Sequence, residues 1–187
     1  SQTDANGNVT TFTYDADVNM LTKTEAYATA LQRTATYTYN SFGEALTVTD
    51  PDGNTTAYTY DSTGNLLQEK DAQNNTTSHT YDSKGQKLTD TDPKGNITTY
   101  TYDVYGNLAS VINALGQTTT YTYDIMGNLL SMTDANGSKT TYTYDLRYRL
   151  IKETRPNGGI ITYTYDLVGN RIAMTDANGN RTTFTYD

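Results

Sequence analysis

Aromatic and hydroxyl-bearing residues alternate along most of the chain. Residues 98–102, for example, read Thr-Thr-Tyr-Thr-Tyr, and this period of two is the pattern of a β-strand whose two faces differ. Short segments of the form Asp-x-x-Gly separate the alternating stretches and are typical of tight turns. Only six or seven residues lie between turns, so long helices are excluded. The pattern predicts an all-β chain built as an antiparallel meander of β-hairpins.

A tyrosine followed by aspartate, or once by asparagine, recurs at regular intervals. The first interval, from Tyr14 to Tyr39, is twenty-five positions, and the seven that follow are each twenty-one. Self-similarity at a fixed period indicates a repeat protein. Each unit contains one turn directly after the tyrosine and a second turn further on, so it supplies two strands. Nine tyrosine-bearing strands and eight strands between them give 17 predicted strands. These tyrosines are Tyr14, Tyr39, Tyr60, Tyr81, Tyr102, Tyr123, Tyr144, Tyr165 and Tyr186.

The turn positions carry the residues that tight turns require. Thirteen of the 14 glycines, all except Gly159, occupy the fourth position, where a left-handed backbone is expected and glycine has no Cβ to clash. Asn74 replaces glycine once and tolerates this conformation. Tyr148 replaces it in another turn, which predicts a strained turn or a different turn type. Aspartate is the first residue in 13 of 16 recognisable turns, where its carboxylate can accept the following amide hydrogens.

Two further columns of residues accompany the repeated tyrosine. The residue two positions earlier is aromatic: Phe12, Tyr37, Tyr58, His79, Tyr100, Tyr121, Tyr142, Tyr163 and Phe184. The residue seven positions later is apolar: Leu21, Leu46, Leu67, Leu88, Ala109, Leu130, Ile151 and Ile172. Because side chains alternate with period two, a repeat of odd length would flip these columns to the opposite face in each unit. Alignment of the columns needs one parity break per repeat, either a β-bulge or two turns of different length.

One unit departs from the period. A four-residue insertion lies within residues 25–36, and residues 25–33 lack both glycine and proline, so we expect a helical turn there. Such an extension serves either as a functional loop or as a tolerated surface insertion. Apart from it, residues 1–187 form one repeat array, which we expect to be a fragment of a longer array.

Composition excludes several classes of function. The absence of cysteine excludes disulfides, thiolate nucleophiles and cysteine-based zinc sites. The net charge is −8 and the 13 Lys and Arg residues are scattered, which argues against a nucleic-acid partner. No apolar run approaches the roughly 20 residues that cross a bilayer, and the first residues do not resemble a signal peptide.

A few residues suggest chemistry, but each has a structural alternative. The repeated aspartates could bind calcium, yet they stand where a turn begins, and turn formation explains them better. His79, the only histidine, occupies an aromatic-column position and is better explained as a column member than as a ligand or base. Arg147, Arg149, Lys152 and Arg155 cluster around Tyr148 and form either a solvated face or a contact for an anion or partner. We therefore identify no catalytic, cofactor-binding or metal-binding residue, and no cofactor.

The motif at residues 60–66, Tyr-Asp-Ser-Thr-Gly-Asn-Leu, resembles the YD-repeat (Rhs-repeat) family, and the resemblance covers essentially the whole chain. Family members commonly carry Arg after the turn glycine, whereas this chain prefers Asn and has Arg one step later, at Arg171. The resemblance implies a strip of β-hairpins that curls into a spiral shell or an open barrel-like sheet, as in Rhs polymorphic toxins, the Tc toxin cocoon and teneurins. Nothing after Tyr144 resembles the family's self-cleavage region, so we expect no self-processing.

Two functions follow from this resemblance. The first is a non-enzymatic scaffold of a secreted toxin, a hollow β-shell that encapsulates or presents an effector domain. The alternative is an extracellular adhesion or carbohydrate-binding and partner-binding repeat. Both place the chain outside the cell or on its surface. The expected partners are further repeats or another copy bound edge to edge, an enclosed toxin domain, and glycans, with no nucleic acid and no membrane span.

Overall fold

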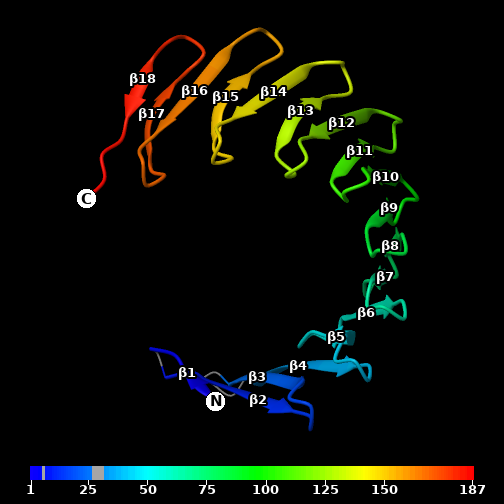
Figure 1. Cartoon of the computed structure of the whole chain (residues 1–187). Coiled ribbons are helices and arrows are strands. Elements are labelled where there is room, and N and C mark those ends of the chain that lie inside the picture. Colours follow the sequence, from blue (N-terminus) through cyan, green and yellow to red (C-terminus); the bar gives the residue numbers. More distant parts are fainter. Residues whose placement is uncertain (6, 27–31) are drawn as a thin grey trace. The chain divides into compact units, whose positions relative to one another are not determined.

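The computed structural model describes residues 1–187 except residues 6 and 27–31. The described residues form 18 β-strands and no helix. They divide into two compact units, Ser1–Ile97 and Thr98–Asp187, with the boundary at the start of β10. Each unit is an antiparallel meander in which consecutive strands pair (Figure 1). The predicted all-β hairpin meander is therefore confirmed.

The first unit contains nine strands, each joined to the next by a short turn. They are β1 (Gln2–Thr3), β2 (Val9–Tyr14), β3 (Met20–Ala26), β4 (Gln32–Tyr39), β5 (Ala45–Thr49), β6 (Thr55–Tyr60), β7 (Leu66–Lys70), β8 (Thr76–Tyr81) and β9 (Lys87–Thr91). Strand β1 was not among the 17 predicted strands. These correspond to β2–β18, except that the last strand, β18 (Arg181–Thr183), ends before its predicted tyrosine, Tyr186. It pairs with β2 through Gln2 opposite Thr10 and Thr3 opposite Val9.

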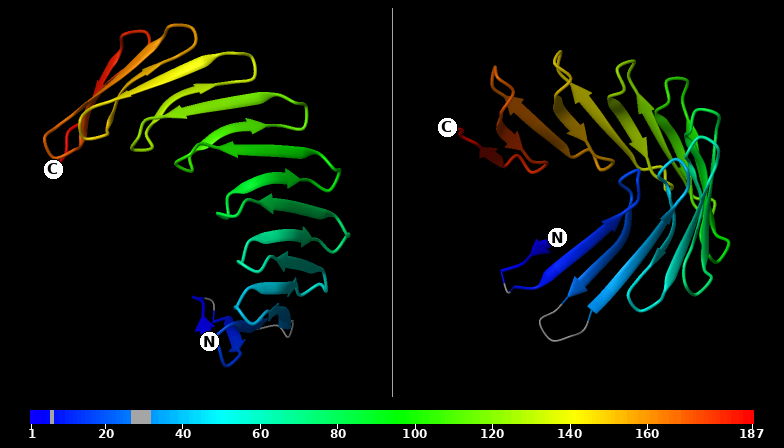
Figure 2. Two further views of the ribbon diagram at one scale, coloured as in Figure 1. Left: turned by 45° about the vertical axis from the view of Figure 1, so that its right-hand side comes forward. Right: turned by 90° about the horizontal axis from the view of Figure 1, so that it is seen from below.

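The second unit repeats the same arrangement with nine more strands. They are β10 (Ile97–Tyr102), β11 (Leu108–Ile112), β12 (Thr118–Tyr123), β13 (Leu129–Thr133), β14 (Lys139–Tyr144), β15 (Leu150–Thr154), β16 (Ile160–Tyr165), β17 (Arg171–Thr175) and β18 (Arg181–Thr183). The turns alternate between the two ends of the strands, so every second turn lies at the same rim (Figure 2). We call the rim formed by the turns that follow the repeated tyrosines the YD rim, and the other the opposite rim.

The turns on both rims share one hydrogen-bond pattern. In the turn at residues 50–54, the Asp50 amide donates to the Asn54 carbonyl (2.9 Å) and the Gly53 amide to the Asp50 carbonyl (3.0 Å). Fifteen other turns among the described residues repeat both bonds. The fourth position has positive φ at all 13 predicted glycines and at Asn74, as expected. Tyr148 keeps the same turn with φ 60°, so this turn is strained rather than of another type.

A β-bulge in every hairpin that turns at the YD rim provides the parity break. In the β10–β11 hairpin, Tyr102 lies opposite Leu108 and Thr101 opposite Ser110, so Ala109 is an extra residue on β11. The same shift occurs in seven other hairpins, and the extra residue is always the member of the apolar column. Because all turns share one geometry, different turn lengths are not the cause. The bulge keeps the tyrosines of successive repeats on one face.

The insertion lengthens one hairpin instead of forming a helix at the residues that the structure describes. Strands β3 and β4 continue their pairing outward, with Glu25 opposite Arg33 and Ala26 opposite Gln32. The predicted helical turn is therefore wrong for these four residues, because the ladder extends across them. Residues 27–31 lie outside the described part of the chain.

Each unit is a single layer of sheet and has almost no buried core. Among the described residues, only Ile161, Ala173 and Ser131 are buried. The repeated tyrosines and the aromatic column share one face, because they lie two residues apart in each strand. Threonines at the intervening positions line the other face. We call these the aromatic face and the hydroxyl face.

Candidate functional surfaces

The repeated tyrosines hold neighbouring hairpins together on the aromatic face. Between β13 and β14, backbone pairing covers only residues 131–133 and 139–141, near the opposite rim. Toward the YD rim, the Tyr144 hydroxyl donates to the Leu129 carbonyl at 3.0 Å. Leu129 immediately precedes the bulge residue Leu130. Burial raises the pKa of Tyr144, so its hydroxyl remains protonated and able to donate.

This tyrosine bond recurs along the array. Further bonds of this kind, at 2.9 or 3.0 Å, join Tyr39 to Met20, Tyr60 to Ala45, Tyr165 to Leu150 and Tyr186 to Arg171. In each case the acceptor is the carbonyl of the residue before the bulge. The bulge interrupts the ladder, and the tyrosine of the next hairpin supplies a donor near that interruption. The repeated tyrosine is thus a structural joint between repeats.

The hydroxyl face is held together by pairs of side-chain hydroxyl groups. Thr101 lies opposite Ser110 with their oxygens 2.7 Å apart, and Thr122 lies opposite Ser131 with their oxygens 2.8 Å apart. Equivalent threonine pairs in the first unit join residues 13 and 22, 38 and 47, and 80 and 89. Cross-strand pairs of this kind each add a few tenths of a kcal/mol, up to about 1 kcal/mol, to a sheet.

The repeated aspartates are engaged in building the turns. Asp124 Oδ1 accepts the amides of Met126 and Asn128, both at 2.9 Å, and Oδ2 accepts Asn128 Nδ2 at 2.8 Å. These bonds, first of all the one from the Asn128 side chain, lower the pKa of Asp124. The asparagine after the turn glycine therefore helps to hold the turn, because both its backbone amide and its side chain donate to the aspartate. No group of three or more His, Asp or Glu side chains suited to a metal ion occurs in the described part of the chain.

His79 lies in the aromatic column, as predicted, and has a polar contact that the sequence did not indicate. Its Nδ1 contacts Asp90 Oδ1 directly across the β8–β9 pair. Lys87 Nζ lies 3.0 Å from the same carboxylate oxygen. The three side chains form a small charged cluster within the aromatic face.

The arginines near Tyr148 bind neighbouring turns. Arg149 contacts the Asp145 carboxylate at 2.7 Å and donates to the Asp166 carbonyl at 3.0 Å. Its guanidinium carbon also lies 4.7 Å from the centre of the Tyr165 ring, a cation–π geometry. Arg147 donates to the Leu167 carbonyl. Arg149 directly follows Tyr148, the fourth residue of its turn, which is where members of the family commonly carry arginine. The chain therefore has an arginine at this position once, in addition to Arg171, which lies one residue further from its turn glycine.

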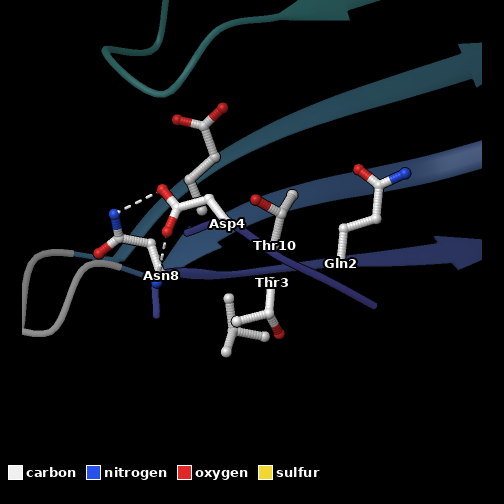
Figure 3. Close-up of a pocket in the computed structure, with 7 residues that line it drawn as sticks. Gln2, Thr3, Asp4, Asn8 and Thr10 are labelled. Carbon is white, nitrogen blue, oxygen red and sulfur yellow. Dashed lines mark hydrogen bonds between the residues drawn. The ribbon is translucent and has the colours of Figure 1, made fainter. Parts of the chain in front are cut away.

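The cavities among the described residues are shallow features between turns and strands. One of about 280 Å³ lies beside β1 and is lined by Gln2, Thr3, Asp4, Asn8, Val9, Thr10 and Glu25 (Figure 3). Within it, Asp4 Oδ2 accepts Asn8 Nδ2 at 2.8 Å, the same bond that builds the other turns. Five of the seven lining residues lie in strands β1–β3, and only Asp4 and Asn8 belong to a turn.

An apolar stretch of the YD rim in the second unit was not predicted from the sequence. The second turn positions there are Val104, Ile125, Leu146 and Leu167, with exposed fractions of 85, 80, 100 and 86%. The third positions add Tyr105, Met126 and Val168, which are also exposed. We call these seven residues the apolar rim. The alternation of strand residues gave no signal for them, because they lie in turns.

The profile of the RHS Repeat family matches the chain seven times, at residues 39–76, 60–97, 81–117, 102–139, 127–160, 149–180 and 165–187. The first match begins at Tyr39, and the seven matches together extend to the last residue. The chain belongs to the RHS repeat family. No curated protein matches it at a significant level.

Solved structures with a similar fold include TcdB2-TccC3 and a Tc holotoxin pore. TcdB2-TccC3-TEV is 24% identical, with a TM-score of 0.76 over 98% of this chain. The Tc holotoxin pore of Photorhabdus luminescens is 23% identical, with a TM-score of 0.73 over 94% of this chain. TcdB2-TccC3 without its hypervariable C-terminal region is 21% identical, with a TM-score of 0.72 over 91%. This chain spans only 11 or 12% of the length of those chains.

Because the described residues form no helix, a membrane-spanning helix is not found among them.

Proposed function

We propose that the chain is a wall segment of a β-shell in a secreted toxin, where it encloses or presents an effector domain outside the producing cell. The observation that carries this proposal is the fold similarity to TcdB2-TccC3 over nearly the whole chain. Those assemblies are toxins, and TcdB2-TccC3 has a hypervariable C-terminal region. A variable segment attached to regular repeats fits an exchangeable cargo and a constant container.

The organisation of the sheet supports a wall better than a catalytic domain. Each unit is one layer thick and buries almost no side chain, so its stability depends on hairpin-to-hairpin bonds. The recurring positions of the repeat are used in these bonds: aspartate and asparagine in turns, and tyrosine at bulge carbonyls. We infer that the array acts as a non-enzymatic scaffold.

Protease protection tests the proposal in the natural polypeptide that contains residues 1–187. We expect a segment that follows the repeats to resist trypsin in the wild type and to become sensitive in a Gly116→Val variant. Gly116 has φ 75°, a conformation that valine rarely adopts. Leu115→Ser, a change at an exposed position in the same turn, is the matched control and should preserve protection.

Enclosure would be refuted if trypsin cleaved that segment in the wild type as readily as in the Gly116→Val variant. If the wild-type array instead retained glycans in a binding assay while its flanking segments stayed protease-sensitive, the adhesion function would replace the shell.

A further inference from the structure

The apolar rim lies on the YD rim of the second unit, where all four turns carry exposed apolar tips. On the YD rim of the first unit, one large apolar side chain, Phe42, occurs at these positions. The second positions there are Ala16, Ser41, Ser62 and Ser83, and the third positions are Asp17, Phe42, Thr63 and Lys84. On the opposite rim of the second unit, the third position is leucine in one turn, Leu115, and asparagine in the other three: Asn136, Asn157 and Asn178. The turn geometry is the same throughout and does not require large apolar tips. Turn formation alone therefore does not account for their accumulation on four successive turns.

The size of this surface is sufficient for a specific interface. A fully buried Leu, Ile, Val or Met side chain removes roughly 60–120 Å² of apolar area from water, as its transfer energy implies. Seven such tips therefore offer on the order of 500 Å² in each copy, which is comparable to the largest apolar patch of a typical monomer, about 300–600 Å² and often functional. Two copies that bury these tips against each other would approach the roughly 1,000 Å² that a biological interface requires.

The charges near the tips are compatible with burial. Asp103, Asp124 and Asp166 direct their carboxylates toward the amides of their own turns. Arg147, the charged residue at a third position, donates to the Leu167 carbonyl of the next turn. Partners within the rim therefore already satisfy part of the charge that an interface would cover.

We propose that the apolar rim binds the apolar rim of a second copy of this chain, in a two-fold symmetric contact. The tips of both copies recur once per hairpin, at two strand spacings of about 4.8 Å, so their periods match. Two-fold contacts of a patch with itself are the commonest in soluble oligomers. The opposite rim is a poorer partner, because its asparagines would lie against the apolar tips and lose water. This contact joins rims, and is distinct from strand addition at the sheet edges.

Sedimentation of residues 1–187 over a concentration series tests this contact. Leu146→Asp places a charge at a fully exposed tip, where folding does not depend on it, and should weaken dimerisation by at least about tenfold. Leu115→Asp is the matched control: Leu115 is also a turn tip, 83% exposed, but on the opposite rim, and its change should alter dimerisation less than twofold. Circular dichroism checks that both variants retain the wild-type sheet. Association through sheet edges would affect both variants alike, so the difference between them isolates the rim.

Cross-linking through introduced cysteines identifies the partner surface. The chain has no cysteine of its own, so each introduced cysteine is its only reactive thiol. Leu146→Cys should give covalent dimers with a short bifunctional maleimide, whereas Leu115→Cys should give few. Equal dimerisation constants for Leu146→Asp and Leu115→Asp would overturn the proposal. So would predominant cross-links between a Leu146→Cys copy and a Leu115→Cys copy, which would show head-to-tail stacking. Binding of the wild-type chain to phosphatidylcholine vesicles in place of dimerisation would assign the rim to lipid and also overturn it.

Discussion

Removal of a single tyrosine hydroxyl should loosen one joint between hairpins. Tyr144→Phe keeps the ring on the aromatic face but removes the donor to the Leu129 carbonyl, which lies 3.0 Å away. The pairing of β13 with β14 covers only three residue pairs, so this side-chain bond is a substantial part of that joint. A hydrogen bond of this kind contributes about 1 kcal/mol, and residue Leu129 is only half-buried, so the loss should lie between about 0.5 and 1.5 kcal/mol.

Amide hydrogen exchange measures this local effect. In a repeat array, stability is approximately a sum of nearest-neighbour terms, so the change should stay near the altered joint. We expect faster exchange, by roughly threefold to tenfold, for amides that pair β13 with β14, and unchanged exchange in β16–β17. Tyr105→Phe is the matched control, because Tyr105 is an exposed turn tip. If Tyr144→Phe and Tyr105→Phe changed exchange equally, the tyrosine joint would not hold the hairpins together.

Four further predictions concern turns and edges. Val18, a β-branched residue with φ 68° at an exposed turn, is strained, so Val18→Gly should stabilise the chain by about 0.5–1 kcal/mol in urea denaturation; a loss of stability would contradict this. Millimolar calcium should leave the melting temperature unchanged in calorimetry, because turn amides use the aspartate oxygens; a rise of many degrees would indicate a calcium site. The pKa of Asp61 and of other turn aspartates is lowered, chiefly by asparagine side-chain bonds, so their stabilisation is present above the ordinary value near 3.9 and is lost as pH falls through the lowered values. The melting temperature should therefore decrease as the pH is lowered below about 4. A melting temperature that stays constant down to pH 2 would refute this dependence of stability on the turn aspartates. Finally, the edges of β1 and β18 should promote self-association that light scattering detects on concentration, whereas a concentration-independent monomer would show that the edges are blocked.

The sequence was sufficient to predict the strands, the turns and the need for a parity break. Asp and Gly spacing predicted the turns, because both residues have local reasons to occupy those positions. The bulge could not be located in advance, because its position depends on the pairing of two strands and not on either strand alone. The apolar column marked it, but most apolar residues in strands belong to a regular ladder, so the column alone did not indicate a bulge. Once the register is known, every member of that column is the extra residue.

Two local features were missed for different reasons. Val18 occupies the fourth position of a turn that begins at Asp15, so counting from the aspartate could have identified its positive φ. The extended β3–β4 hairpin was not recognised because a segment without glycine or proline is equally compatible with helix and strand. Cross-strand pairing, such as that of Glu25 with Arg33, decided between them. The apolar rim has no strand periodicity and became visible only when the turns were placed on a common rim.

The bulge also defines how an array of this kind can change in length. Because one extra residue in each hairpin restores the alternation, one complete repeat begins and ends with the same side chains on the same face. Duplication or loss of whole repeats by recombination would therefore produce longer or shorter arrays whose two faces remain continuous. A gained or lost segment that is one residue shorter or longer than the repeat would exchange the faces for all later strands. One whole repeat is thus the natural unit by which the array can lengthen or shorten while both of its faces stay continuous.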